Sequence, residues 1–178
     1  MRLQSTLIYR ADPELISRML IDPAFQEILG QSLDAPECST VVGPDDITTT
    51  YVIPTPASLR PVAGAQSKLI GRLGWTGPLT AGRRLGRLTL EVERFPATFE
   101  AVVRLEADGE QTQVTYEADL HVNIPFLGRK LEQQVGDLTQ KILDTGQTAG
   151  EQWLERFGPQ AGSAVAAEPG SQPGPARL

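Results

Sequence analysis

The amino-acid sequence predicts an α+β fold in which a curved, seven-stranded antiparallel sheet holds a long C-terminal helix on its concave face. Three features of the chain favour this fold. Strand-like alternation of polar and apolar residues fills most of residues 37–124. Two Asp-Pro pairs follow the first strand and predict two short helices. Apolar residues from Leu127 to Phe157 recur every three or four positions, as on one face of a helix.

The first elements are a strand and the two short helices. Residues 2–10 alternate between two faces with the period of a half-buried strand. Asp12 can cap a helix that begins at Pro13, where the missing N–H would have no partner anyway. Asp22 and Pro23 repeat this pattern, so a second short helix follows directly. The residues that share one face are Leu3, Ser5, Leu7 and Tyr9 in the strand, Leu15, Met19 and Leu20 in the first helix, and Phe25, Ile28 and Leu29 in the second.

Residues 37–124 carry only strand signals. Turn-forming segments separate them, one of them around Gly109, which predicts an antiparallel meander of six strands. The last strand is the clearest, because its apolar residues from Val114 to Ile124 alternate with polar ones and leave a single dry face. The six strands are predicted at residues 37–42, 47–53, 67–75, 84–94, 97–106 and 112–124.

One connection, residues 54–66, is unusually long. Pro54, Pro56 and Pro61 exclude a central strand from it. Connections of this length are either functional lids or ordinary surface loops, and the sequence leaves both alternatives open.

The C-terminal helix is expected to cover the dry face of the sheet. It would be about 46 Å long, against about 33 Å for a ten-residue strand, so it can cross the whole sheet. The chain beyond it is rich in Pro, Gly and Ala, which predicts a disordered tail. We therefore expect a folded domain over residues 1–157 and a tail over residues 158–178. The predicted apolar stripe consists of Leu127, Leu131, Val135, Leu138, Ile142, Gly146, Ala149, Trp153 and Phe157.

The composition argues against several classes of function. A formal net charge of -6 repels polyanions, so nucleic acid is not an expected partner. The single cysteine, Cys38, can form neither an internal disulfide nor a thiolate zinc cluster. No stretch approaches the roughly 18 apolar residues of a membrane helix, and no signal peptide is recognisable. We expect a cytoplasmic protein that is not an integral membrane protein.

Few residues suggest catalysis. His121 falls on the wet face of its strand, where solvation is the expected role. Cys38 lacks a basic neighbour in the sequence, which indicates a structural thiol. Glu91, Glu93 and Glu100 alternate with arginines and are expected to form ion pairs in water. The glycine-rich stretch "GRLGWTGPLTAGRRLG" lacks the lysine of a phosphate-binding loop. No catalytic residue can be named, and no cofactor or metal is expected.

Several of these features resemble a known family. They are the order of elements, "DPAF" after the first helix, Trp75 at the end of the fourth strand, and "VNIPFLGRKLEQ" before the last helix. They are similar to an actinobacterial family catalogued as domain of unknown function 2505, over Met1 to Phe157. That family is placed in the SRPBCC or START-like superfamily, with polyketide cyclase-like proteins and the Bet v 1-type plant allergens.

The resemblance implies a helix-grip fold with a cavity between sheet and helix, used in the superfamily for lipids, sterols, polyketides and other apolar molecules. Small residues at Gly146 and Ala149 leave room for such a cavity, although a densely packed core is equally compatible with the stripe. A cavity between Ile142 and Tyr51 is the feature that a structure must contain. The residues predicted to bind the ligand are Thr49, Tyr51, Trp75, Phe99, Tyr116, Leu138, Ile142 and Gly146, with Thr49, Tyr51 and Tyr116 as polar anchors.

Three functions fit this architecture. The first is a non-catalytic carrier or sensor of an apolar small molecule or lipid. The second is a polyketide cyclase-like or hydratase-like enzyme that uses the same cavity. A catalyst needs an internal acid or base, and the predicted interior contains no Asp, Glu, His or Lys, which favours the carrier. The third is an interaction module, which would have a filled interior and an exposed apolar patch.

Overall fold

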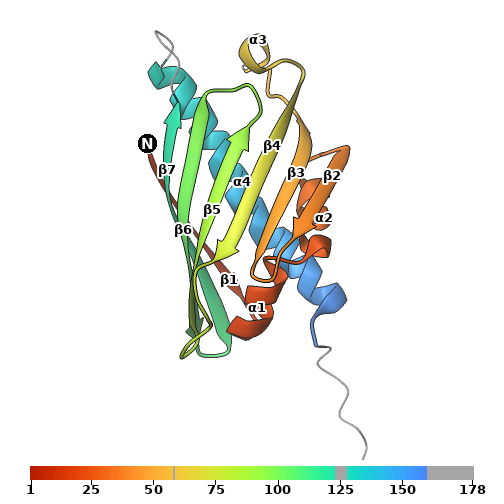
Figure 1. Ribbon diagram of the computed structural model, residues 1–178, viewed down its shortest axis with the longest axis vertical. Coiled ribbons are helices and arrows are strands. Elements are labelled where there is room, and N and C mark those ends of the chain that lie inside the picture. Colours follow the sequence, from red (N-terminus) through yellow and green to blue (C-terminus); the bar gives the residue numbers. More distant parts are fainter. Residues whose placement is uncertain (58, 123–127, 160–178) are drawn as a thin grey trace, which may run out of the picture.

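The protein folds as a curved antiparallel sheet crossed by one long helix (Figure 1). The computed structural model describes residues 1–57, 59–122 and 128–159. The elements are, in chain order, β1 (Arg2–Tyr9), α1 (Pro13–Met19), α2 (Pro23–Ser32), β2 (Glu37–Val42), β3 (Asp46–Pro54), α3 (Arg60–Ala63), β4 (Gln66–Trp75), β5 (Arg83–Val92), β6 (Ala97–Asp108), β7 (Gln111–Val122) and α4 (Gly128–Phe157).

Both short helices begin where the sequence predicts. The side chain of Asp12 accepts a 2.9 Å hydrogen bond from the backbone N–H of Leu15 at the start of α1. At the start of α2, the side chain of Asp22 accepts a 2.7 Å hydrogen bond from the N–H of Ala24. Each cap satisfies a backbone donor that the helix cannot, which typically contributes about 1 kcal/mol.

The sheet has the order β1-β7-β6-β5-β4-β3-β2, and each neighbouring pair is antiparallel. Strands β2 to β7 form the predicted meander, and β1 joins beside β7. The free edge of β1 is covered by α4, because the Gln147 side chain accepts from the N–H of Ile8 at 2.9 Å and donates to its carbonyl at 2.8 Å. One side chain of α4 therefore pairs with the free backbone N–H and C=O of Ile8 on the edge strand.

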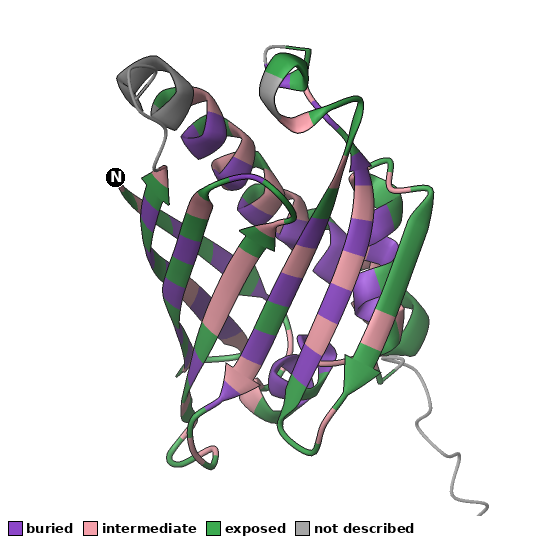
Figure 2. Ribbon diagram, turned by 45° about the horizontal axis from the view of Figure 1, so that its top comes forward, coloured by how far each residue is buried: buried purple, intermediate pink, exposed green. Residues whose placement is uncertain are grey.

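Most strands alternate between buried and more exposed residues, which Figure 2 shows as bands of colour along the ribbons. In β7, every second residue from Thr112 to Leu120 is buried. The predicted inward residues of the strands are buried or half-buried: Leu7, Tyr9, Thr49, Tyr51, Leu73, Trp75, Phe99, Val103, Tyr116 and Leu120 are buried, and Leu88 and Leu90 are half-buried.

The helix approaches β1 closely at two glycines. The hydroxyl of Tyr9 donates a 2.8 Å hydrogen bond to the carbonyl of Gly146. One turn further on, a Cβ atom at Gly150 would lie only 2.3 Å from Cε1 of Tyr9. Only glycine leaves room for the Tyr9 ring at that position, so the contact fixes how closely α4 lies to the sheet.

Among the described side chains the stripe of α4 is as predicted except at Phe157, while Leu127 and Leu131 lie outside them. Phe157 is 54% exposed, because it lies in the last turn of α4. Its ring contacts that of Trp153 at a centroid distance of 5.6 Å. Thr139 and Leu143 are buried although they were not predicted to be. Both lie beside the predicted stripe, because a helical face of 3.6 residues per turn is wider than a single row.

The connection between β3 and β4 contains the short helix α3, which the sequence did not predict. Its first residues include Pro61, which fits an early helical position. The choice between lid and surface loop stays open. The predicted end of the last strand at Ile124, the predicted helix start at Leu127 and the predicted disorder of residues 160–178 lie outside the described residues.

Candidate functional site

A partly open cavity of about 80 Å³ lies between α2, α4 and the concave face of the sheet. A site for one water needs about 10–15 Å³, so this cavity has room for a molecule of about the size of a single ring. Its described walls are mostly apolar and include no charged side chain. The lining residues are Leu20, Phe25, Gln26, Leu29, Ile47, Thr49, Tyr51, Leu69, Gly71, Leu73, Leu88, Leu90, Tyr116, Ile142, Leu143 and Gly146.

One wall of the cavity is held by a polar pair between α2 and β3. The hydroxyl of Tyr51 donates a 2.5 Å hydrogen bond to Oε1 of Gln26. The Nε2 of Gln26 donates in turn to the carbonyl of Leu20 at 3.0 Å. Burial raises the pKa of Tyr51 well above its ordinary value. The Tyr51 proton and the Gln26 amide are therefore already used within the protein.

Two other hydroxyls at the cavity have no such partner. Thr49 is 2% exposed, and its Oγ1 forms no hydrogen bond. It lies on the same face of β3 as Tyr51 and lowers the pKa of that phenol slightly against the larger effect of burial. Tyr116 is 6% exposed, and its hydroxyl has no hydrogen-bond partner among the described residues. Buried hydroxyls are usually paired, so these two need a partner that the described residues do not supply.

Tyr9 does not line the cavity, but it contacts a residue of the cavity wall. Its hydroxyl is held by the Gly146 carbonyl, and Gly146 is part of the cavity wall. Burial is the main reason why the pKa of Tyr9 is well above its ordinary value, and Tyr116 and Glu151 raise it further. Burial likewise raises the pKa of Tyr116. All these phenols stay neutral at physiological pH.

Five of the eight predicted ligand-binding residues line the cavity, namely Thr49, Tyr51, Tyr116, Ile142 and Gly146. Sequence reasoning missed Gln26, which is 8% exposed and pairs with Tyr51. The available signal was its position three residues before Leu29, on the inward face of α2.

The other three predicted residues do not line the cavity. Trp75 is turned toward α1, where its Nε1 donates to the carbonyl of Ser17 at 3.1 Å. Phe99 is 3% exposed and packs within the main core on β6. Leu138 lies one turn before Ile142 on α4 and packs on that same core. Inward orientation was predicted correctly for all three, but it does not distinguish a core position from a cavity wall.

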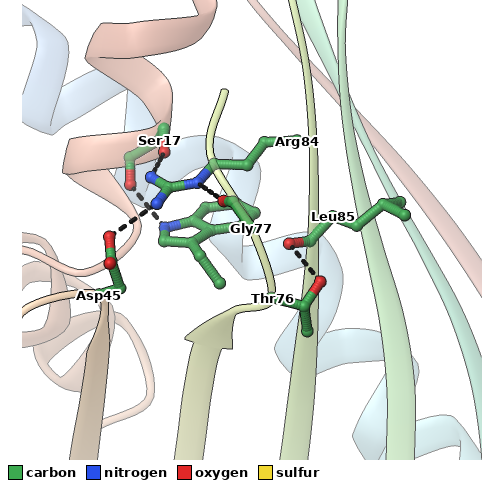
Figure 3. A network of polar contacts seen from close by, with 7 residues as sticks. Ser17, Asp45, Thr76, Gly77, Arg84 and Leu85 are labelled. Carbon is green, nitrogen blue, oxygen red and sulfur yellow. Dashed lines mark hydrogen bonds and ion pairs between the residues drawn. The ribbon is translucent and has the colours of Figure 1, made fainter. Parts of the chain in front are cut away.

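Trp75, at the end of β4, adjoins a polar cluster around Arg84. Figure 3 shows Arg84 with Ser17, Asp45 and Gly77. The guanidinium of Arg84 lies 5.1 Å from the centre of the Trp75 ring. It donates to Oγ of Ser17 at 2.7 Å, to Oδ1 of Asp45 at 2.7 Å and to the carbonyl of Gly77 at 2.9 Å. These bonds join α1 to two turns of the sheet. The polar side chains that line the open groove of about 740 Å³ at this place therefore have a structural role.

The residues considered for catalysis lie outside the cavity. His121 is exposed, as predicted. Cys38 is exposed too; partial burial of its sulfur, followed by the Glu27 carboxylate, raises the pKa of its thiol. Glu91 pairs with Arg72 at 2.8 Å and Glu93 with Lys68 at 3.6 Å across exposed strands.

Within the described part of the chain, no three His, Cys, Asp or Glu side chains are grouped to hold a metal ion. None of the described helices combines the length and apolar character needed to cross a membrane.

Solved structures of the same architecture support the assignment of the fold. Protein TTHA0849 of Thermus thermophilus superposes with a TM-score of 0.64 at 18% identity, covering 88% of this chain and 98% of that one. The Zhui aromatase/cyclase of Streptomyces sp. R1128 superposes with a TM-score of 0.57 at 13% identity, covering 88% of this chain and 96% of that one. A START superfamily protein of Mycobacterium smegmatis superposes with a TM-score of 0.53 at 14% identity, covering 85% of this chain and 97% of that one. The fold is therefore the START-like helix-grip fold.

Within this class, the chain belongs to the family described as "Protein of unknown function (DUF2505)", which matches residues 4–154. No curated protein matches the sequence. The family description carries no activity, so function has to be argued from the cavity itself.

Proposed function

We propose that this protein binds an apolar small molecule in the cavity between the sheet and α4, and carries or senses it without transforming it. The observation that supports this most directly is the partly open, mainly apolar cavity, whose wall includes both Tyr51 and Ile142. Apolar pockets with a few placed polar groups are the usual form of small-molecule sites. An interaction module with a filled interior would lack such a cavity.

The size of the cavity bears on the ligand. About 80 Å³ is small beside the several hundred Å³ of a typical drug-sized pocket. A compact molecule fits the cavity as it stands, with any longer portion extending through the open side. A lipid lying fully inside would require α2 or α4 to move outward.

A carrier is favoured over a polyketide cyclase-like or hydratase-like enzyme by the chemistry of the wall. General acid–base catalysis works best with a group whose pKa lies near the operating pH. The described lining has no Asp, Glu, His or Lys, and burial moves the pKa of Tyr51 and of Tyr116 further from neutrality. Likeness of fold to an aromatase/cyclase does not supply the missing group.

Native mass spectrometry of the protein purified from its own host tests the proposal. We expect a co-purifying apolar molecule that is lost in Ile142→Trp, because the indole would fill the cavity from α4. Leu138→Trp is the matched control, since Leu138 is a half-buried residue one turn away that does not line the cavity. A protein that is consistently empty, or a ligand retained equally in both variants, would refute binding at this site.

A cytoplasmic location and an actinobacterial source stay predictions from the sequence. Fractionation of the native host checks the first: we expect the protein in the same fraction as a cytoplasmic marker. Recovery of the protein with the membrane or secreted fraction would contradict that location.

A further inference from the structure

The cavity discriminates between ligands by charge and by hydrogen bonding, and this inference rests on the binding function proposed above. We infer that the ligand is electrically neutral and carries a hydrogen-bond acceptor, such as a carbonyl or ether oxygen, that accepts a hydrogen bond from an unpaired hydroxyl of the wall, that of Tyr116 or that of Thr49. Neither hydroxyl has a hydrogen-bond partner among the described residues. Both residues belong to the cavity wall.

Neutrality follows from the composition of the wall. The described lining contains no Lys, Arg or His to pair with a carboxylate, and no Asp or Glu to pair with an amine. An unpaired charge in an apolar site is strongly disfavoured, and it protonates or deprotonates rather than remain there. A carboxylate or ammonium group that has to lie inside the cavity is therefore disfavoured.

The requirement for an acceptor follows from which polar groups are already paired. Tyr51 and Gln26 are paired with each other, and Gln26 is also bonded to Leu20. The hydroxyls of Tyr116 and Thr49 are left, and each has a proton to donate. Buried donors without a partner are rarer in proteins than acceptors with spare lone pairs. A pure hydrocarbon would shut the Tyr116 hydroxyl away from water without replacing its hydrogen bond, and it would leave the buried Thr49 hydroxyl unpaired.

Three single-ring probes of matched size separate these properties. Acetophenone is neutral and carries a carbonyl, α-methylstyrene replaces that carbonyl by a carbon–carbon double bond, and benzoate is an anion of similar shape. Binding is measured at pH 7 by titration calorimetry, with protein-observed NMR for the weaker probes. We expect acetophenone to bind about tenfold more tightly than α-methylstyrene, the value of one well-placed buried hydrogen bond. Benzoate should bind at least about tenfold more weakly than acetophenone.

Two variants test which hydroxyl causes the preference for acetophenone over α-methylstyrene. Tyr116→Phe and Thr49→Val remove one free hydroxyl each at nearly constant shape, and at least one of them should lower the ratio of the two neutral affinities severalfold. Tyr9→Phe is the control, because the Tyr9 hydroxyl is bonded to Gly146 and lies outside the cavity wall. The control should keep the full ratio.

The outcomes distinguish this inference from the function on which it rests. Equal binding of acetophenone and α-methylstyrene, or a full preference in both hydroxyl variants, would overturn the acceptor while leaving apolar binding intact. Benzoate binding as tightly as acetophenone would overturn neutrality. Failure of all three probes, together with an empty native protein, would overturn the proposed function itself.

Discussion

The hydroxyl of Tyr51 on β3 donates a 2.5 Å hydrogen bond to Oε1 of Gln26 on α2, and this bond closes one side of the cavity. Both residues are buried, so a hydroxyl or amide left without its partner there is costly. The short helix is thereby tied to the sheet at the point where a ligand would lie.

Tyr51→Phe should destabilise the protein, because Oε1 of Gln26 then loses its buried donor. We expect the free energy of unfolding in urea to fall by about 1–3 kcal/mol. Tyr116→Phe is the matched control, since it removes a hydroxyl that has no partner among the described residues, and it should change stability by less than about 0.5 kcal/mol. Equal losses in the two variants would contradict the pairing.

Gly150→Ala should also destabilise the protein, against the normal preference of helices for alanine. The added Cβ would lie 2.3 Å from Cε1 of Tyr9, so α4 must move away from β1. Overpacking of this kind costs about 1–3 kcal/mol, more than the gain of up to about 1 kcal/mol from helix propensity.

Gly146→Ala is the comparison for that variant. The nearest atom to its added Cβ would be Cδ1 of Leu7 at 3.3 Å, which a small side-chain shift can relieve. Thermal unfolding should therefore rank Gly146→Ala well above Gly150→Ala in midpoint temperature. The reverse order would show that α4 does not lie as close to Tyr9 as the structure has it.

The fold could be predicted because its signals are local and periodic. Asp12 and Asp22 cap the two short helices, and the alternation around Tyr116 identifies an inward face without knowledge of its neighbours. The exposure of Phe157 could not be predicted, because the hydrophobic stripe continues beyond the point where the helix is covered. The short helix α3 could not be predicted, since four residues are too few to show a helical period of polar and apolar residues.

The site was predictable only in part, for a physical reason. Periodicity tells which residues point inward, but whether they meet one another depends on the curvature of the sheet and the placement of α4. Phe99 and Tyr116 have equally clear inward signals, yet only Tyr116 lines the cavity. The partner of Tyr51 is Gln26, 25 residues away in the chain, and no sequence pattern links the two.

Arg84→Ala should weaken the junction between α1 and the turns of the sheet. Its guanidinium donates three hydrogen bonds, stacks on Trp75 and has a side chain only 14% exposed. We expect a loss of about 2–3 kcal/mol in urea unfolding. Arg72→Ala is the control, because the pair of Arg72 with Glu91 is half exposed and such pairs contribute less than about 1 kcal/mol. Similar losses would contradict a special role of Arg84.

The raised pKa values of the buried tyrosines predict a loss of stability in alkali. Tyr9, Tyr51 and Tyr116 have folded pKa values above the ordinary value of 10.0, chiefly because of burial. The folded state therefore holds these protons more tightly than the unfolded chain. Their stabilising contribution is complete below about pH 10 and is lost as the pH rises above it, at up to about 1.4 kcal/mol per pH unit for each group.

Urea midpoints measured from about pH 8 to about pH 11 check this expectation, because folding should become steeply less favourable only in the upper part of that range. The double variant Tyr51→Phe, Tyr116→Phe has two fewer buried phenols and should show a shallower decline, starting from a lower stability at neutral pH because Gln26 has lost its donor. An unchanged slope in the double variant would mean that the alkaline loss arises at other groups, and that these two hydroxyls are not as shielded from water as their burial indicates.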